Sequence, residues 1–208
     1  MSRSAANLIQ MMRDHKLRVF MTSDFITLSR MGRSAAVHAL CRLASQRIIA
    51  RIKRATWVNL LVGDLHPYEA VPFLRAPWPA YVSLHSALAD HGIVAEIPHV
   101  IYAVSGALPK KYRTPLGDFH IHHLPAHLIW GYEMKRVGQG SHPVAEPEKA
   151  FLDLVYLALT PRSPLQLPHK RGPRWKLDTT KLKSFARRFG YRPLIVYLKE
   201  NSLWGSRR

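Results

Sequence analysis

Residues 22–60, TSDFITLSRMGRSAAVHALCRLASQRIIARIKRATWVNL, decide the fold that the sequence predicts. The side-chain oxygens of residues 22–24 can cap the start of a short helix that buries Phe25. Gly32 ends this helix, and a second helical pattern opens directly after it. A glycine-containing turn of this length between two helices predicts a helix-turn-helix.

The second helix has an apolar side and a polar side. At 100° per residue, its apolar half contains Ala36, Val37, Leu40, Cys41, Leu43 and Ala44. The polar half begins with short side chains and carries donors that can reach base edges or phosphates in a major groove. We therefore predict a recognition helix whose DNA-binding residues are Arg33, Ser34, His38 and Arg42.

The residues after this helix predict a β-hairpin with a basic tip. Residues 48–52 and 56–61 have the composition of two short strands, and the wing residues between or beside them are Arg51, Lys53 and Arg54. A basic hairpin next to a recognition helix can hold phosphates or enter the minor groove. The whole stretch therefore predicts a winged helix-turn-helix.

The rest of the chain predicts further helices and strands. Residues 5–17 predict a first helix, and residues 17–21 a short strand before the helix pair. Prolines between residues 67 and 79 indicate a connector, and thus a domain boundary after residue 62. Further helices are expected at 81–91, 146–159, 177–189 and 192–203, and strands at 100–105, within 112–124 and at 137–144.

Positive charge is concentrated at both ends of the chain, which has 208 residues and a formal net charge of +18. Residues 1–62 hold 11 Lys and Arg against 2 Asp and Glu, whereas residues 63–159 hold 7 against 9. Residues 160–208 hold 13 against 2. Two basic ends around a near-neutral middle favour a polyanion as partner, and nucleic acid is the usual one. The alternative is a basic surface that only keeps the protein in solution.

The basic C-terminal segment predicts a second phosphate-binding surface. Residues 160–176 are rich in proline and basic side chains, as in a linker, and residues 177–189 predict a helix with an outward basic side. We assign this surface to Lys170, Arg171, Arg174, Lys176, Lys181, Lys183, Arg187 and Arg188. The alternative is that these charges only solvate the helix.

The single cysteine and the hydropathy pattern indicate the compartment in which the protein works. Cys41 falls on the predicted buried half of its helix, so we expect no disulfide within the chain and no cysteine-based zinc site. No apolar run approaches the roughly 18 residues of a membrane-spanning helix, and the N-terminus lacks the apolar core of a signal peptide. We expect a cytoplasmic protein that needs no cofactor.

Three motifs after the predicted winged helix occur in an order that resembles the AbiEi family. They are YVSLHSALADHG at residues 81–92, TPLGDF at 114–119 with histidines after it, and PEKAFLD at 147–153. The resemblance covers about residues 20–156. AbiEi proteins are antitoxins and autorepressors of type IV toxin-antitoxin systems, originally described in phage abortive infection.

The resemblance implies two domains with different functions. It implies an N-terminal winged helix-turn-helix that represses the operon and a C-terminal domain that opposes a nucleotidyltransferase-like toxin. Relatives of this family also occur as stand-alone regulators, so a winged-helix regulator without a toxin is the alternative.

A histidine cluster raises the possibility of a metal site. On a strand, His120 and His122 would project from the same face, with His123 and His127 close in sequence. No cysteine and no nearby carboxylate pair completes a known zinc site, so we expect no bound metal.

A second enzymatic alternative is a metal-dependent nuclease. Asp118, followed by Glu133 and Lys135, imitates the metal-site pattern of restriction-type nucleases. Carboxylates there would hold Mg²⁺ while the lysine supports an attacking water. The pattern is short, and we expect no enzymatic activity.

The sequence therefore predicts a two-domain α/β protein of the α+β type. A winged helix-turn-helix at residues 1–62 precedes an α+β, antitoxin-like domain at 63–208 with basic C-terminal helices. We expect it to repress its own operon by binding double-stranded operator DNA, arranged as an inverted repeat. The competing class is a pure interaction protein, whose binding would not fall steeply with salt.

Overall fold

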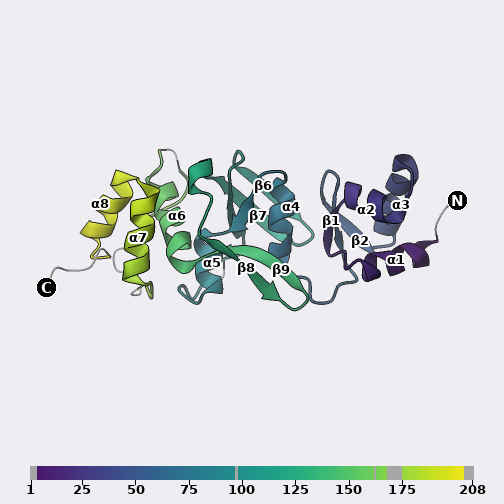
Figure 1. The fold of residues 1–208 in the computed structure, drawn as a ribbon, viewed down its shortest axis with the longest axis horizontal. Coiled ribbons are helices and arrows are strands. Elements are labelled where there is room, and N and C mark those ends of the chain that lie inside the picture. The colour runs from purple at the N-terminus through teal and green to yellow at the C-terminus, as the bar shows by residue number, and fades with distance from the viewer. Residues whose placement is uncertain (1–3, 97, 162, 168–174, 204–208) are drawn as a thin grey trace.

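The structure is a computed structural model that describes residues 4–96, 98–161, 163–167 and 175–203. These residues form an elongated, mixed α+β molecule with two β-sheets (Figure 1). The helices are α1 (Ala5–Asp14), α2 (Thr22–Ser29), α3 (Arg33–Ser45), α4 (Ala70–Arg75), α5 (Leu84–Asp90), α6 (Pro147–Leu159), α7 (Thr179–Phe189) and α8 (Arg192–Glu200). The strands are β1 (Val19–Met21), β2 (Ile49–Lys53), β3 (Thr56–Asn59), β4 (Ala80–Val82), β5 (Ile101–Ser105), β6 (Lys110–Thr114), β7 (Gly117–His123), β8 (Tyr132–Val137) and β9 (Gly140–Ala145). Two short 3-10 helices are η1 (Pro67–Glu69) and η2 (Ala126–Leu128).

The N-terminal helices α1, α2 and α3 pack on one face of a small antiparallel sheet with the strand order β1-β3-β2. Phe20 and Trp57 from this face join a buried cluster with Phe25 of α2 and Leu40 of α3. The rings of Phe20 and Phe25 stack with their centroids 6.2 Å apart. Full burial of an apolar side chain contributes about 1.5–3 kcal/mol, so this cluster is what fixes α3 on the sheet.

The opposite face of the small sheet belongs to a second, larger core. Val19, Ile52 and Val58 are buried there together with Val71 and Leu74 of α4. Helix α4 contacts both β1 and β3, and strand β2 contacts β6 of the larger sheet. The small sheet is therefore packed on both faces, and apolar burial helps to fix the N-terminal region on the rest of the molecule.

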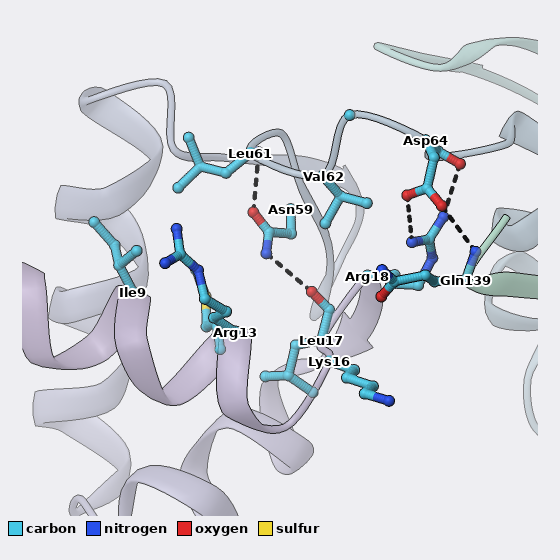
Figure 2. Close-up of a pocket in the computed structure, with 12 residues that line it drawn as sticks. Ile9, Arg13, Lys16, Leu17, Arg18, Asn59, Leu61, Val62, Asp64 and Gln139 are labelled. Carbon is cyan, nitrogen blue, oxygen red and sulfur yellow. Dashed lines mark hydrogen bonds and ion pairs between the residues drawn. The ribbon is translucent and has the colours of Figure 1, made fainter.

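Arg18, which directly precedes β1, adds a charged connection at the same junction. Its Nε and Nη2 donate to the two carboxylate oxygens of Glu69 at 2.7 and 2.8 Å. Its Nη1 donates to Oδ1 of Asp64 at 2.7 Å, and Asp64 Oδ2 accepts the backbone N–H of Gln139 at 2.8 Å (Figure 2). The pKa of Asp64 lies below its usual value. The hydrogen bond from the Gln139 N–H is the largest cause, and the hydrogen bond from Arg18 is the next. We call Arg18, Asp64 and Glu69 the Arg18 latch.

The larger sheet is mixed and has the strand order β6-β7-β5-β4-β9-β8. The pairs β4–β9 and β5–β7 are parallel, and the other neighbours are antiparallel. Helices α5 and α6 contact the face that carries Tyr81 and Tyr102. Helix α4 lies against the other face, where the hydroxyl of Tyr112 donates to the carbonyl oxygen of Leu74 at 2.8 Å. Strands β6 and β8 form the two edges.

The structure confirms the α+β class but corrects two predicted elements. The helix expected over 81–91 is wrong at its start, because Tyr81 and Val82 lie in β4 and the helix begins only after Ser83. Val82 pairs with Val144 of β9, a partner distant in sequence, so no local signal indicates this strand. The single strand expected at 137–144 is instead the hairpin β8–β9, which turns at Gly138 with a φ of +57°.

The C-terminal helices α7 and α8 pack on α6 at the end of the molecule opposite to α3 (Figure 1). Asp178 caps α7, since its carboxylate accepts the N–H groups of Thr180 and Lys181 at 2.8 and 3.1 Å. Gly190 ends the helix in the left-handed conformation, with a φ of +65°. These local signals explain why the sequence predicts α7 closely.

Candidate nucleic-acid interface

Helix α3 presents all four residues of the predicted recognition surface to solvent. Arg33, Ser34, His38 and Arg42 are each exposed. The turn before α3 uses Arg30 in the left-handed conformation, with a φ of +52°, whereas Gly32 is extended and serves as the N-cap. The predicted break therefore occurs where expected, but the residue with positive φ is the arginine.

The predicted apolar half of α3 is wrong at two positions. Val37 is 40% exposed and Cys41 is exposed as a free thiol. Ala39 is buried instead, because the buried stripe runs through residues 36, 39–40 and 43. This shift places Val37 and Cys41 on the exposed side, next to His38 and Arg42.

The hairpin of β2 and β3 places two of the three predicted wing residues in solvent. Arg51 and Arg54 are exposed, and Ala55 at the tip has a φ of +58°. Lys53 is half-buried, and its Nζ donates to the carbonyl oxygen of Leu74 at 3.2 Å. The sequence does not indicate this contact, because Leu74 belongs to α4 of the larger core.

A basic groove lies beside the hairpin tip and was not predicted. Its volume is about 730 Å³, and its lining contains cationic, imidazole and apolar side chains but no Asp or Glu: Lys53, Arg54, Ala55, Leu74, Arg75, Ala76, Pro77, Trp78, Gly106, Ala107, Leu108, Lys110, Tyr112 and His123. We call it the wing groove. Trp78 and Leu108 are 54% and 78% exposed at its surface.

The cations of the wing groove repel one another, and this repulsion affects the pKa of Lys53. Burial lowers the pKa of Lys53, and the charges of Arg75 and Lys110 lower it further. Arg75 is held in place, since its Nη1 donates to the hydroxyl of Tyr112 at 2.9 Å and its Nη2 to the carbonyl oxygen of Leu108 at 2.6 Å. An anion bound in the groove would relieve this repulsion. The basic residues at 110–113 are the only sign of the wing groove in the sequence. No local pattern indicates that they lie beside the hairpin tip.

The structure describes only part of the predicted second phosphate-binding surface. Lys170, Arg171 and Arg174 lie outside the described residues, while Lys176 and Arg187 are exposed and Lys183 is half-buried.

Two other members of that surface are already engaged. Lys181 is paired with Glu146 and Glu148, and its hydrogen bond with Glu146 is the largest cause of a raised pKa. The guanidinium carbon of Arg188 lies 4.1 Å from the ring centre of Trp130. A phosphate would have to compete with these contacts, which makes α7 a weaker candidate than the wing groove.

The predicted histidine pair lies on one face of β7, as the alternation of that strand indicates. The ring of Tyr102 packs against both His120 and His122, at centroid distances of 5.8 and 6.1 Å. Burial is the main reason why the pKa of His122 is lowered to about 4. His123 lies on the other face and His127 is exposed. Within the described ranges, no group of three His, Cys, Asp or Glu side chains is arranged to hold a metal.

The structure does not bring the suggested nuclease residues together. Asp118 on β7 faces Arg113, with 3.6 Å between Oδ1 and Nε. Glu133 and Lys135 lie on β8, four strands away in the sheet. Neighbouring strands are about 4.8 Å apart, so the separation is on the order of 20 Å. One metal ion cannot contact both carboxylates in this arrangement.

A buried polar cluster joins two of the motifs that carry the family resemblance. Lys149 and Asp153 of α6 form an ion pair, and both side chains are 0% exposed. Asp153 also accepts hydrogen bonds from the hydroxyls of Ser83 at 2.7 Å and Tyr81 at 3.2 Å. Burial raises the pKa of Asp153 and lowers that of Lys149, and the pairing opposes both shifts. These enclosed residues hold α6 on β4 and offer no surface to a ligand.

Two broader observations complete the description of the site. In the part of the chain that the structure describes, every helix is too short or too polar to cross a membrane. A comparison with protein-family models and with curated proteins gives no match for this chain.

Proposed function

We propose that this protein is a DNA-binding transcriptional repressor and that its N-terminal region is a winged helix-turn-helix. The element order α1-β1-α2-α3-β2-β3, with three antiparallel strands behind the helix pair, supports this proposal. In such a domain α3 enters the major groove and the β2–β3 hairpin contacts the backbone beside it.

One observation carries the proposal further than the element order. The exposed residues of α3 belong to the same N-terminal region as a hairpin whose tip borders the wing groove, where several cations meet without an acidic side chain in the lining. Phosphates are the complementary charge, and contacts with them supply most of the affinity of a protein for DNA. The wing groove therefore extends the proposed DNA surface from the hairpin tip to Lys110 of β6.

The roles follow from these positions. Arg33, Ser34, His38 and Arg42 read base edges, while Arg51 and Arg54 contact the phosphate backbone. Two copies on an inverted repeat are the usual arrangement for such a domain. Following the AbiEi resemblance, we further propose that the repressed operon is its own and encodes a toxin; a stand-alone regulator is the alternative.

The experiment is a fluorescence-anisotropy titration of the full chain on its own upstream region and on a scrambled duplex, across a salt series. We expect a preference for the upstream DNA that persists with salt, and a slope of log affinity against log salt of about −0.9 for each phosphate contacted. Equal affinity for the two duplexes would reject a specific repressor. A shallow salt dependence would favour a protein-interaction module instead.

A further inference from the structure

A cavity lies between the N-terminal region and the connector that leads to the larger sheet. Its volume is about 300 Å³, and it is walled by α1, the end of β3, the residues after β3 and the turn between β8 and β9 (Figure 2). The lining residues are Ile9, Met12, Arg13, Lys16, Leu17, Arg18, Asn59, Leu61, Val62, Gly63, Asp64 and Gln139. This volume is at the lower end of the range for small-molecule sites. We call it the junction cavity.

The apolar part of the junction cavity is incompletely covered by the protein itself. Met12 is buried at its floor, whereas Leu61 on the connector is 56% exposed. In Figure 2 the side chains of Ile9 and Leu61 both lie beside the guanidinium of Arg13. A ligand with an apolar body would remove this surface from water, which favours its binding.

The charged part of the cavity has an excess of cations. Arg18 and Asp64 satisfy each other within the Arg18 latch. Arg13 and Lys16 take part in none of the ion pairs found among the described residues, and both are exposed. Arg13 projects from α1 toward the connector, while the ammonium group of Lys16 points away from it (Figure 2). A carboxylate beside Arg13 would meet a planar donor group that can bind both of its oxygens.

Hydrogen bonds of Asn59 hold the wall opposite α1 in place. Asn59 is only 5% exposed, its Nδ2 donates to the carbonyl oxygen of Leu17 at 3.0 Å, and its Oδ1 accepts the N–H of Leu61 at 3.1 Å. These two bonds tie the start of the connector to Leu17, which lies between α1 and β1. A cavity held open in this way loses little entropy when it is filled.

We propose that the junction cavity binds a small organic carboxylate with an aliphatic body. Arg13 binds the carboxylate, Lys16 adds long-range attraction, and the aliphatic body packs on Ile9, Met12 and Leu61. A further consequence rests on the proposed function. Because the occupant contacts α1 of the N-terminal region and the connector together, it alters the affinity for operator DNA.

Isothermal titration calorimetry with three probes of one shape tests the site without DNA. The probes are hexanoate, hexan-1-ol and hexylammonium, which differ only in charge and head group. We expect hexanoate to bind, hexan-1-ol to bind about tenfold more weakly because it lacks the charge-assisted hydrogen bonds, and hexylammonium not to bind. Equal affinity for the alcohol and the carboxylate, or no heat with any probe, would overturn the proposal.

Variants of the cavity residues test where hexanoate binds. Arg13→Gln keeps a good helix former at an exposed position, and it should weaken hexanoate binding about tenfold. Leu61→Glu should abolish binding, since it puts a carboxylate at an exposed position of the cavity wall. Arg192→Gln, at the exposed start of α8 at the opposite end of the molecule, is the matched control and should bind as the wild type does. Hexanoate binding that is indifferent to both cavity variants lies elsewhere, and the proposal fails.

The regulatory consequence is tested separately with operator DNA. Hexanoate at a concentration that just saturates the wild type should change its affinity for the upstream duplex by about fivefold or more, and the same concentration should have a smaller effect on Arg13→Gln, whose site is only partly filled. If the chain binds no DNA specifically, the proposed function fails while the calorimetric result stands. If hexanoate binds but leaves DNA affinity unchanged, the cavity is a site without coupling to DNA, and the regulatory part is wrong.

Discussion

The loss of Asp153 should strongly destabilise the protein. Its carboxylate is fully buried between Lys149, Tyr81 and Ser83, so its removal leaves two hydroxyls without an acceptor and the ammonium group with only the hydroxyl oxygen of Tyr81. Removing one partner of a buried pair costs about 3–5 kcal/mol, whereas replacing both by apolar residues is often neutral. We predict that Asp153→Leu lowers the free energy of unfolding by about 3–5 kcal/mol in urea titrations.

The double variant Lys149→Met/Asp153→Leu is the internal control for this prediction. It should recover a large part of the lost stability, because no uncompensated charge remains in the core. A double variant as unstable as Asp153→Leu would show that the hydroxyl partners, rather than the ammonium group, account for the loss.

His142 should make stability depend on pH. Its ring is fully buried on β9, it stacks on His66 with centroids 4.7 Å apart, and neither ring nitrogen has a partner among the described residues. Burial is the main reason that its pKa is lowered to about 4. Between about pH 6.5 and pH 4 this histidine is therefore protonated in the unfolded chain but neutral in the folded one. The free energy of unfolding consequently falls as the pH drops from 6.5 toward 4.

We predict that this residue contributes on the order of 2 kcal/mol to the loss of stability between pH 7 and pH 4.5. Guanidinium titrations of the wild type and of His142→Gln at the two pH values measure it. The variant should lose less stability on acidification, although His122 keeps part of the effect. Identical pH dependence in the two proteins would contradict the prediction.

At the scale of the element, helix α3 and the β2–β3 hairpin should contribute to DNA binding in different ways. If Arg42 reads a base, Arg42→Ala costs about 1–3 kcal/mol on the upstream duplex and little on a scrambled one. Arg54→Gln at the hairpin tip should weaken binding to both duplexes equally and reduce the salt slope by about one. Anisotropy titrations on both duplexes distinguish the two patterns, and equal losses for Arg42→Ala would reject its role in reading sequence.

Elements with strong local signals could be predicted, and those defined by distant partners could not. Helix α6 begins at Pro147 and α7 follows the cap Asp178, so their first residues are visible in the sequence. Strand β4 is three residues long and exists because Val82 lies between β5 and β9. Nothing in the sequence around Val82 distinguishes that pairing from one more helical turn.

The residues of the candidate interface likewise fall into those that local sequence patterns predict and those that depend on distant partners. The exposure of Arg33 and Arg42 follows from the period of one helix and could be predicted. The wing groove could not, since Lys53 and Lys110 are distant in sequence and meet only because β2 packs against β6. The same contact explains why Lys53 is half-buried rather than a free wing residue.

At the scale of the whole molecule, the Arg18 latch should control how firmly the N-terminal region is held. Arg18→Ala leaves the carboxylate of Glu69, which is 6% exposed, without its cation. The cost of such a change is about 3–5 kcal/mol for a fully buried pair, and we expect less here because Asp64 is solvent-accessible. We predict that chymotrypsin cleaves the variant faster at the leucines of residues 60–65.

The matched control is Arg113→Ala, which removes an exposed ion pair with Asp118 and should leave cleavage unchanged. Small-angle scattering should also show a wider range of shapes for Arg18→Ala than for the control. Cleavage and scattering equal to those of the wild type would mean that apolar packing of β1 and β3 on α4 suffices.

The elongated shape also limits how the two basic ends can cooperate. Helix α3 and helix α7 lie at opposite ends of the molecule (Figure 1). One straight half-site bound by α3 therefore does not also contact Arg187. A contribution of Arg187 to affinity would point to bent DNA or to a second copy on the same duplex.

The free edges of the larger sheet have a consequence for handling the protein. Strand β6 exposes Lys110, Lys111 and Arg113, and strand β8 exposes Glu133 and Arg136. Charged side chains on an edge strand discourage another chain from pairing with it and so oppose aggregation. Lys110, which we assign to phosphate binding, thus also helps to keep copies of the chain apart. Substitutions of Lys110 or Lys111 should be to glutamine rather than to valine or isoleucine, because a loss of DNA binding by an aggregated variant carries no information about phosphate contacts.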